Sequence, residues 1–336
     1  MDKKKVLVVG AGGFAGGFIV EEGLRRGYEV WAGVRSSTSR KYLADERIRF
    51  VEFDFDDYEQ IKRMMTTTLP EGEKWDWIIY NLGATKCLSF SDFSKINYDY
   101  LRIFTEAVKS TGMMPEKMLY MSSLSVVGPG DEKDYTPFTE KMIPHPNTRY
   151  GASKLKAEMQ LAMSSIPYII FRATGIYGPR DKDYFLMLES VKKGFDFSVG
   201  YKRQVLTFIY VEDLARAIYD ALERSAVGET YNIAEGRDYT QKEFRKIAAE
   251  VVGKSVVIPV RVPLWGLRIV SAIAEKWGVA RMKPSTLNSD KYNIMKQRNW
   301  RVSISKAREG FGFDPKIDLH EGMRRAAEWY KKEGWL

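Results

Sequence analysis

Short apolar runs alternate with longer amphipathic segments through the first half of the chain. The apolar runs predict buried strands, and apolar residues at helical spacing predict helices between them. The predicted strands cover residues 6–9, 29–34, 48–53, 75–80, 118–121 and 168–171. Helices are predicted after residue 17, from residue 58, over 97–110 and over 150–163. Because strands that alternate with helices form parallel sheets with right-handed crossovers, the predicted fold class is α/β with a doubly wound parallel sheet.

A glycine-rich turn separates the first predicted strand from the first helix. Glycine permits a tight turn and the close approach of a phosphate, and a helix that begins there directs free N–H groups at an anion. The turn is therefore predicted to hold the pyrophosphate of a dinucleotide in a Rossmann-type fold. The predicted contacts are Gly10, Gly13, Phe14, Ala15 and Gly16. A turn without a ligand is one alternative, and a signal peptide is another, although the glycines would break its helix.

The second predicted strand ends in basic and hydroxyl side chains. Arg35 lies nineteen residues after Gly16, about where a dinucleotide fold places the side chain that meets the adenosine ribose. A carboxylate there would favour NAD(H), whereas an arginine pairs with the 2′-phosphate of NADP(H). We therefore predict NADP(H) rather than NAD(H), with Arg35, Ser36 and Arg40 as contacts. The alternative is a solvated charged loop.

Other strand ends are predicted to complete the cofactor site, because ligands of open parallel sheets lie outside the carboxyl ends of the strands. After strand 75–80, a turn of small residues would let the cofactor lie flat over the sheet. The predicted contacts are Asp54, Phe55, Leu82, Gly83, Ala84, Ser122, Ala173 and Ile176.

Three Tyr-x-x-x-Lys pairs occur in the chain, and their context separates them. Tyr58/Lys62 and Tyr292/Lys296 have no strand-end serine before them, whereas Tyr150/Lys154 follows Ser123 and precedes another predicted strand. Side chains at positions i and i+4 lie on one helix face and can act on one ligand. This context selects Tyr150, Lys154 and Ser123 as candidate catalytic residues.

The chemistry of this trio is that of a general acid or base. Lowering the pKa of a tyrosine from about 10 to about 7 takes about 4 kcal/mol, which an ammonium about 4 Å away supplies at an effective dielectric near 20. Lys154 is predicted to do this, helped by the positive charge of an oxidised nicotinamide, and to hold the nicotinamide ribose. Tyr150 would exchange the proton of a substrate hydroxyl, and Ser123 would bind the substrate oxygen.

Composition and charge narrow the class of protein. The 336 residues are 44% hydrophobic and 29% charged, as in ordinary globular proteins. Cys87 is the single cysteine, which excludes an internal disulfide and predicts a cytoplasmic location. His145 and His320 are the only histidines, and no metal site is predicted. The net charge of +9 suits an anionic partner, but the scattered basic residues argue against nucleic acid and favour a small-molecule substrate.

Together these motifs resemble the extended short-chain dehydrogenase/reductase family, also called the NAD-dependent epimerase/dehydratase family. The glycine turn VLVVGAGGFAGG, the strand end MSSLSVVG and the helix start YGASK are each similar to a landmark of that family. Later segments, FRATGIYGPRD, FIYVEDLARAI and TYNIAEGRDYTQKEF, are similar to it in order and spacing. The resemblance implies an NAD(P)-dependent enzyme and a homodimer.

Departures from the family pattern point to a subgroup. Sugar-nucleotide dehydratases of the family carry Thr-Asp-Glu where Ser123–Ser125 stands, and sugar epimerases carry Asn and Arg at the places of Gly175 and Thr207. Residues 174–181 instead resemble the 3β-hydroxysteroid and sterol dehydrogenase branch and the related dihydroflavonol reductases. The implied function is NADPH-dependent reduction of a ketone on an apolar sterol-, lipid- or flavonoid-like substrate. A nucleotide-sugar epimerase and a non-catalytic NADP-sensing protein are the alternatives.

Beyond the first sheet segment, the chain is predicted to build a smaller lobe. Residues 1–176, completed by about 204–235, are assigned to the dinucleotide-binding domain, and residues 177–203 and 236–336 to the substrate lobe. The predicted strands are 206–210, 229–234 and 256–260, and the predicted helices are 211–222, 241–252, 262–280 and two short ones near Gly310 and Pro315. Helix 262–280 could pack in a core, line an apolar substrate pocket or make peripheral contact with a membrane.

Overall fold

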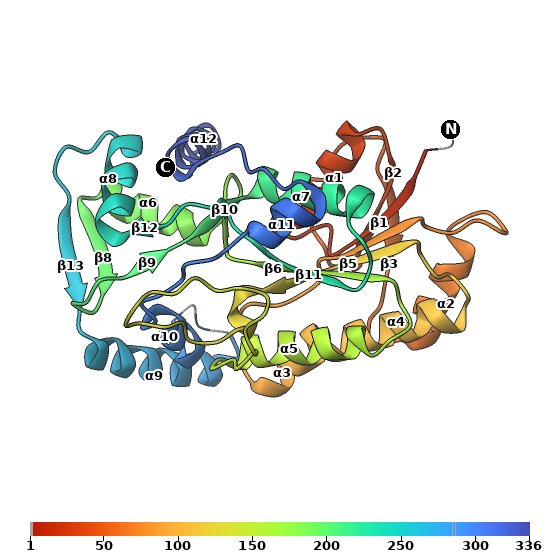
Figure 1. Cartoon of the computed structure of the whole chain (residues 1–336), viewed down its shortest axis with the longest axis horizontal. Coiled ribbons are helices and arrows are strands. Elements are labelled where there is room, and N and C mark those ends of the chain that lie inside the picture. The colour runs from red at the N-terminus through yellow and green to blue at the C-terminus, as the bar shows by residue number, and fades with distance from the viewer. Residues whose placement is uncertain (1–2, 284, 286) are drawn as a thin grey trace.

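A seven-stranded parallel sheet forms the centre of the molecule. The computed structural model describes residues 3–283, 285 and 287–336. The strands lie in the order β11-β6-β5-β4-β1-β2-β3, and each neighbouring pair is parallel (Figure 1). Their bounds are β1 Lys5–Val9, β2 Glu29–Val34, β3 Arg49–Glu52, β4 Trp77–Tyr80, β5 Lys117–Ser123, β6 Tyr168–Ala173 and β11 Glu229–Ile233. The predicted α/β class and doubly wound parallel sheet are confirmed.

Helices cover both faces of this sheet. Because successive strand residues point to opposite faces, Val6 and Val8 of β1 enter one core, while Leu7 and Val9 enter the other. One face is covered by α1 Phe14–Arg25, α7 Val211–Arg224 and α11 Ser305–Phe311 (Figure 1). The other is covered by α2 Tyr58–Thr67, α4 Tyr100–Ser110 and α5 Arg149–Ala162.

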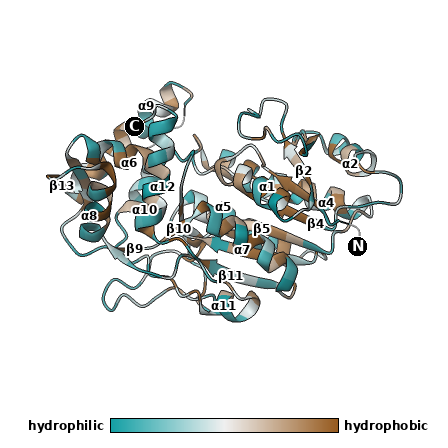
Figure 2. Cartoon of the chain, turned by 90° about the horizontal axis from the view of Figure 1, so that it is seen from above, coloured by the Kyte–Doolittle hydropathy of each residue, from teal (hydrophilic) through white to brown (hydrophobic). Residues whose placement is uncertain are grey.

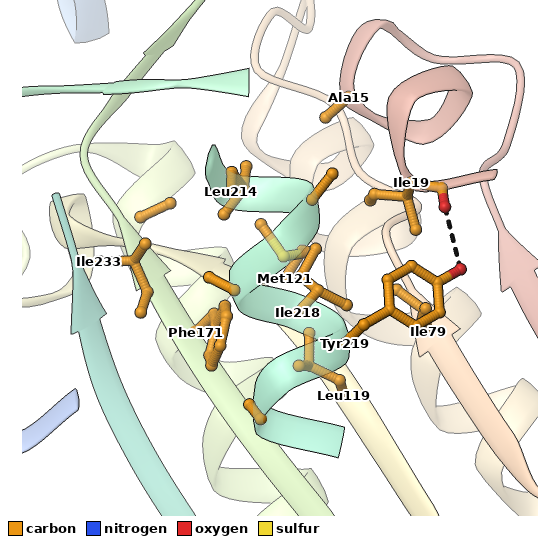
Figure 3. Packing of buried hydrophobic residues seen from close by; sticks show 14 of the residues in the cluster. Ala15, Ile19, Ile79, Leu119, Met121, Phe171, Leu214, Ile218, Tyr219 and Ile233 are labelled. Carbon is orange, nitrogen blue, oxygen red and sulfur yellow. Dashed lines mark hydrogen bonds between the residues drawn. The ribbon is translucent and has the colours of Figure 1, made fainter. Parts of the chain in front are cut away.

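Helix α7 shows how the first core is closed. Leu214 and Ile218 pack with Phe171 of the sheet (Figure 3). The Tyr219 hydroxyl donates a hydrogen bond of 2.9 Å to the carbonyl of Ile19. This bond joins α7 to α1, so α1, which follows the glycine turn, is held by α7 as well as by the sheet.

The smaller lobe lies beside one end of the sheet (Figure 2). It contains α6 Asp183–Lys192, α8 Gln241–Val252, α9 Leu264–Ala280, α10 Ser289–Met295 and α12 Leu319–Lys332. Three two-stranded sheets accompany them: β7 Gly175–Tyr177 with β10 Phe208–Tyr210, β9 Val205–Leu206 with β12 Tyr239–Thr240, and β8 Phe195–Val199 with β13 Ile258–Val262. The division of the chain into two domains at the predicted residues stays a prediction.

Three predicted elements are built differently in the structure, and α6, β8 and α10 are not among the predicted elements. The helix predicted over 97–110 begins earlier, because a capping box of Ser89 and Asp92 starts a helix at residue 90. It consists of α3 Phe90–Ser94, a π-helical turn Lys95–Asp99 and then α4. The strand predicted over 206–210 is divided at Thr207 into β9 and β10, which pair with different partners outside the central sheet. The last helix, α12, is fourteen residues long rather than short.

Candidate active site

The glycine turn after β1 fits a dinucleotide pyrophosphate. Gly10 has a φ of +83°, and a Cβ there would lie 2.8 Å from the backbone nitrogen of Leu82. A Cβ on Gly16 would lie closer still to the carbonyl oxygen of Gly10. Gly13 precedes α1 and has no side chain to cap the first amides of that helix. The turn thus brings bare backbone and a helix N-terminus, which contains Phe14 and Ala15, to one place.

The loop after β2 folds onto this turn. Arg35 and Ser36 are exposed, and the backbone N–H of Arg35 donates to the hydroxyl of Thr38 over 3.1 Å. The methyl group of Thr38 occupies the space that a side chain on Gly12 would need. Thr38, which the sequence analysis did not single out, therefore joins the backbone of Arg35 to the glycine turn.

Arg40 is engaged elsewhere. Its guanidinium pairs with Glu52 over 2.7 Å and stacks 4.3 Å from the ring centre of Phe50. The structure thus places its charge against the end of β3 rather than beside Arg35. The role of Arg35 as a phosphate contact stays a prediction.

The remaining predicted cofactor contacts lie at the carboxyl ends of the strands, but the Phe55 side chain points into the core. The Phe55 ring is buried, with its centre 5.3 Å from the centre of the Tyr100 ring, so only the backbone of Phe55 can contact a ligand. The exposed Asp54 accepts a hydrogen bond from the backbone of Asp56 over 3.0 Å. The others are Leu82, Gly83 and Ala84 after β4, Ala173 at the end of β6 and Ile176 in β7.

Ser122 was predicted to face the cofactor site, but its hydroxyl points to the other side of the sheet. Adjacent strand residues point to opposite sides, and the Ser122 hydroxyl bonds instead to the carboxylate of Glu158 in α5. Glu158 also pairs with Arg172 of β6, whose NH2 group lies 2.7 Å from it. This buried group links α5 to the sheet behind the site.

Ser123 and Tyr150 come together at the carboxyl end of β5. Thr148 caps α5 by accepting the N–H of Gly151 over 2.9 Å, which sets Tyr150 in the first turn of the helix. Burial raises the pKa of Tyr150 to about 12, and its hydrogen bond with the Ser123 hydroxyl acts in the opposite direction. The predicted pKa near 7 depends also on the positive charge of an oxidised nicotinamide, so it stays a prediction for the cofactor-bound site.

The Lys154 ammonium contacts the backbone and the turn after β4 in this structure. Its ammonium donates to the carbonyl of Met121 over 2.8 Å and lies 4.8 Å from the ring centre of Tyr120. Burial lowers the pKa of Lys154 to about 7, and the carboxylate of Glu158 opposes the shift. The ammonium also lies beside Gly83, where a Cβ would be 2.8 Å from its nitrogen. Lys154 thus faces the turn after β4 rather than the phenol.

Asn97 is a site residue that the sequence analysis missed. Its side-chain amide binds both backbone groups of Ala84, over 2.8 and 3.1 Å, and donates to the Ser153 hydroxyl over 2.9 Å. It therefore joins the turn beside Lys154 to the catalytic helix. Asn97 lies in the π-helical turn, whose extra residue shifts the side chains that follow, so regular helical spacing gave no signal.

Asp290 of α10 is a second missed residue. Its carboxylate accepts the backbone N–H groups of Arg149 and Tyr150 over 3.1 and 3.0 Å. The Arg149 guanidinium reaches Glu275 of α9 over 2.5 Å. The smaller lobe thus caps the start of the helix that carries Tyr150, across 140 residues of sequence.

We expect the substitution Asp290→Ala to lower kcat about tenfold or more, because Tyr150 loses the cap that positions it. The lost cap is also expected to cost about 0.5–2 kcal/mol of unfolding free energy. Asp318→Ala is the matched control, because Asp318 caps α12 through the N–H of Glu321 over 2.9 Å. Denaturant titration and steady-state kinetics would compare the two. Equal kcat values in both variants would contradict a positioning role for Asp290.

Gly175 and Thr207, which stand where sugar epimerases carry Asn and Arg, are both surrounded by other groups of the protein. A side chain on Gly175 would collide with the hydroxyl of Tyr184. The Thr207 hydroxyl donates to the carbonyl of Trp300 over 2.7 Å and lies 3.1 Å from the Thr174 hydroxyl. Neither position presents a group to a nucleotide diphosphate.

Comparison with known proteins identifies the family. Residues 6–234 match the model of the NAD dependent epimerase/dehydratase family. The chain belongs to this family. Its members are NAD-dependent enzymes, and the glycine turn, Ser123, Tyr150 and Lys154 described above lie within the matched residues.

Relatives within the family differ in what they do. A sterol-4-alpha-carboxylate 3-dehydrogenase (decarboxylating) from Dictyostelium discoideum is 24% identical, over 95% of this chain and 99% of its own length. A dTDP-glucose 4,6-dehydratase from Neisseria gonorrhoeae is also 24% identical, over 98% and 96%. The crystal structure of the UDP-glucose 4-epimerase of Thermotoga maritima covers 98% of this chain and 99% of its own, with a TM-score of 0.77 and 22% identity. The last likeness concerns the fold.

Proposed function

We propose that this protein reduces a ketone on an apolar substrate, with NADPH as the electron donor. The observation that carries the proposal is the Ser123–Tyr150 pair at the carboxyl end of β5. A phenol at this place can donate a proton to a carbonyl oxygen in reduction, and its phenolate can accept one from an alcohol in oxidation. The choice of reduction rests on the proposed preference for NADPH.

Each candidate site residue has a role in this proposal. A bound nicotinamide cofactor supplies the hydride. Tyr150 donates its proton to the substrate oxygen, and the Ser123 hydroxyl binds the same oxygen and polarises the carbonyl. Lys154 and Gly83 would bind the nicotinamide ribose, and Asn97 holds the adjacent Ala84. The turn Gly10–Gly16 would hold the pyrophosphate.

The filled positions at Gly175 and Thr207 favour a substrate without a nucleotide diphosphate, and the sterol dehydrogenase relative supports an apolar ring system. The test is NADPH oxidation with a panel of 3-ketosteroids, other apolar ketones and flavanones. We expect turnover with at least one apolar ketone and no thermal stabilisation by UDP- or dTDP-sugars. Strong stabilisation by a nucleotide sugar would favour the second candidate, a nucleotide-sugar epimerase or dehydratase, which the other relatives support.

The proposed preference for NADP(H) rests on Arg35. We expect NADPH to bind more tightly than NADH, and Arg35→Asp to reverse this order, because a carboxylate repels a 2′-phosphate and accepts a ribose hydroxyl. Arg47→Ala is the control, since this exposed arginine pairs with Asp45 in the same loop. Titration of each nucleotide by fluorescence would measure the dissociation constants. Equal affinities of the unchanged protein for both nucleotides would refute this role of Arg35.

The homodimer also stays a prediction from the family resemblance. Binding of NADPH without turnover of any ketone, alcohol or nucleotide sugar would instead favour a non-catalytic NADP-sensing protein.

A further inference from the structure

Exposed apolar side chains gather on one part of the smaller lobe. Of the nineteen large apolar side chains that are exposed among the described residues, thirteen lie within residues 195–201 and 256–282. Helix α9 carries seven of them, and β8, β13 and the adjoining turns carry the rest. Single exposed apolar residues are common on proteins, but a contiguous group marks an interaction surface.

Helix α9 buries very little of its own surface. It lies at the outer edge of the lobe (Figures 1 and 2), and Leu267, Ser271 and Gly278 are the residues that it buries. Trp265 is 71% exposed and Trp277 is 60% exposed. Of the three alternatives left open for helix 262–280, core packing does not hold for Leu264, Val270, Ile273 and Trp277, which are exposed. A helix with apolar residues on its outer side requires a partner that covers them.

The neighbouring strands extend this surface. In β8, Phe195 and Phe197 are exposed while Asp196 between them is buried, so the two rings share the outer side. Ile258 of β13 pairs with Phe195 and is exposed as well. The strands join α9 at Pro263, and Gly200 after β8 approaches Leu264. We call α9 with the outer side of β8 and β13 the apolar face.

The charges around the apolar face are almost all positive. Residues 254–283 contain six basic side chains, Lys254, Arg261, Arg268, Lys276, Arg281 and Lys283, and one acidic one, Glu275. Glu275 is turned inward, where it pairs with Arg149 and accepts the N–H of Ser289 over 3.0 Å. Within the described residues, the six basic side chains form no ion pair. The partner of this face is therefore anionic as well as apolar.

We propose that the apolar face docks on the surface of an anionic lipid bilayer. Trp265 and Trp277 suit the boundary between headgroups and acyl chains, and the basic side chains suit anionic headgroups. Helix α9 would lie in the plane of the bilayer, as amphipathic helices at membrane surfaces do. No helix in the described ranges is long and apolar enough to cross a membrane.

Two other occupants fit this face less well. A second copy of the chain would bring the same positive charges against each other across a twofold interface. A small substrate is too short to cover the face, since seventeen helical residues extend about 25 Å.

Docking would bring the bilayer close to the catalytic helix. Glu275 of α9 holds Arg149, and Asp290 of the adjacent α10 holds the N–H of Tyr150. An apolar ketone dissolved in the membrane would then meet the site from the side of α9. The docking itself does not depend on the proposed reaction, so its test measures binding alone.

The test is flotation of the full-length protein with two kinds of vesicle, phosphatidylcholine alone and phosphatidylcholine with about 30 mol% phosphatidylglycerol. We expect the protein to float with the anionic vesicles, less with the neutral ones, and less at high salt. The double substitution Trp265→Ser with Trp277→Ser should lower partitioning about tenfold or more. Replacing Arg268, Lys276 and Arg281 with Gln should weaken binding to anionic vesicles only.

Val227→Ser is the matched control, because Val227 is an exposed apolar residue outside the apolar face. Thermal unfolding would verify that each variant is folded. The proposal is overturned if the unchanged protein floats with neither vesicle, or if the tryptophan variant floats as well as the control. It is also overturned if light scattering shows a dimer that the tryptophan substitutions abolish, since a second copy then covers the face.

Discussion

Replacing Tyr150 with phenylalanine is expected to lower kcat for ketone reduction by about 10²–10⁴-fold, the usual contribution of a general acid. The substitution removes the hydroxyl that bonds to Ser123 and leaves the ring, which packs 6.2 Å from that of Phe93. Because the phenol is proposed to act on the substrate oxygen, the dissociation constant for NADPH should stay unchanged. Steady-state kinetics and nucleotide titration would measure the two quantities.

The chain offers its own control in the other Tyr-x-x-x-Lys pairs. Tyr58→Phe alters the pair in α2, where the Tyr58 hydroxyl bonds to that of Ser110 over 3.0 Å, and should leave kcat as it is. If Tyr150→Phe kept kcat within a few-fold of the unchanged protein, the proposed proton donor would be wrong.

The pH dependence should distinguish the two directions of the reaction. With a pKa of about 12, Tyr150 is protonated at neutral pH and can donate in reduction without further change. Oxidation needs the phenolate, whose fraction rises about tenfold per pH unit below the pKa. We therefore expect the oxidation rate to rise from about pH 7 to about pH 9 while the reduction rate does not. An oxidation rate that is flat over this range would mean that the pKa of Tyr150 is much lower in the working enzyme.

Local signals in the sequence were enough to predict the sheet and the cofactor turn. Short apolar runs located the six strands 6–9 to 168–171, because strands of a parallel sheet are buried on both faces. The glycines at 10, 13 and 16 predicted the cofactor turn. The structure gives the reason for two of them, since a Cβ on Gly10 or Gly16 would collide with backbone. The selection of Tyr150 also relied on a local feature, the strand end before its helix.

Contacts between distant parts of the chain could not be predicted in this way. Asp290 reaches the start of α5 only because the smaller lobe folds back on the sheet. Asn97 depends on a π-helical turn that has no apolar signature. Apolar residues at helical spacing correctly predicted a helix at α9. The same spacing occurs on helices that pack in a core and on helices with an exposed interaction surface, so it does not distinguish the two.

The largest expected effect on stability comes from removing the buried ion pair between Glu158 and Arg172. Arg172→Met should lower the free energy of unfolding by about 3–5 kcal/mol, because it leaves the buried Glu158 carboxylate without its cation. Both side chains are less than 10% exposed, and two guanidinium nitrogens of Arg172 contact the carboxylate, at 2.7 to 3.2 Å. Denaturant titration would measure the change. Arg102→Met is the control, since the exposed Arg102–Glu106 pair should cost less than about 1 kcal/mol.

The double variant Glu158→Gln with Arg172→Met separates the structural role of the pair from its electrostatic role. Removing both charges should restore most of the lost stability, since two neutral groups no longer require a buried counter-charge. The Glu158 carboxylate, however, opposes the lowering of the pKa of Lys154 by burial. Without it the pKa of Lys154 should fall further below about 7, so a stable double variant should still show weaker cofactor binding at neutral pH. A double variant that matches the unchanged protein in both stability and NADPH affinity would mean that the pair serves the sheet alone and leaves Lys154 unaffected.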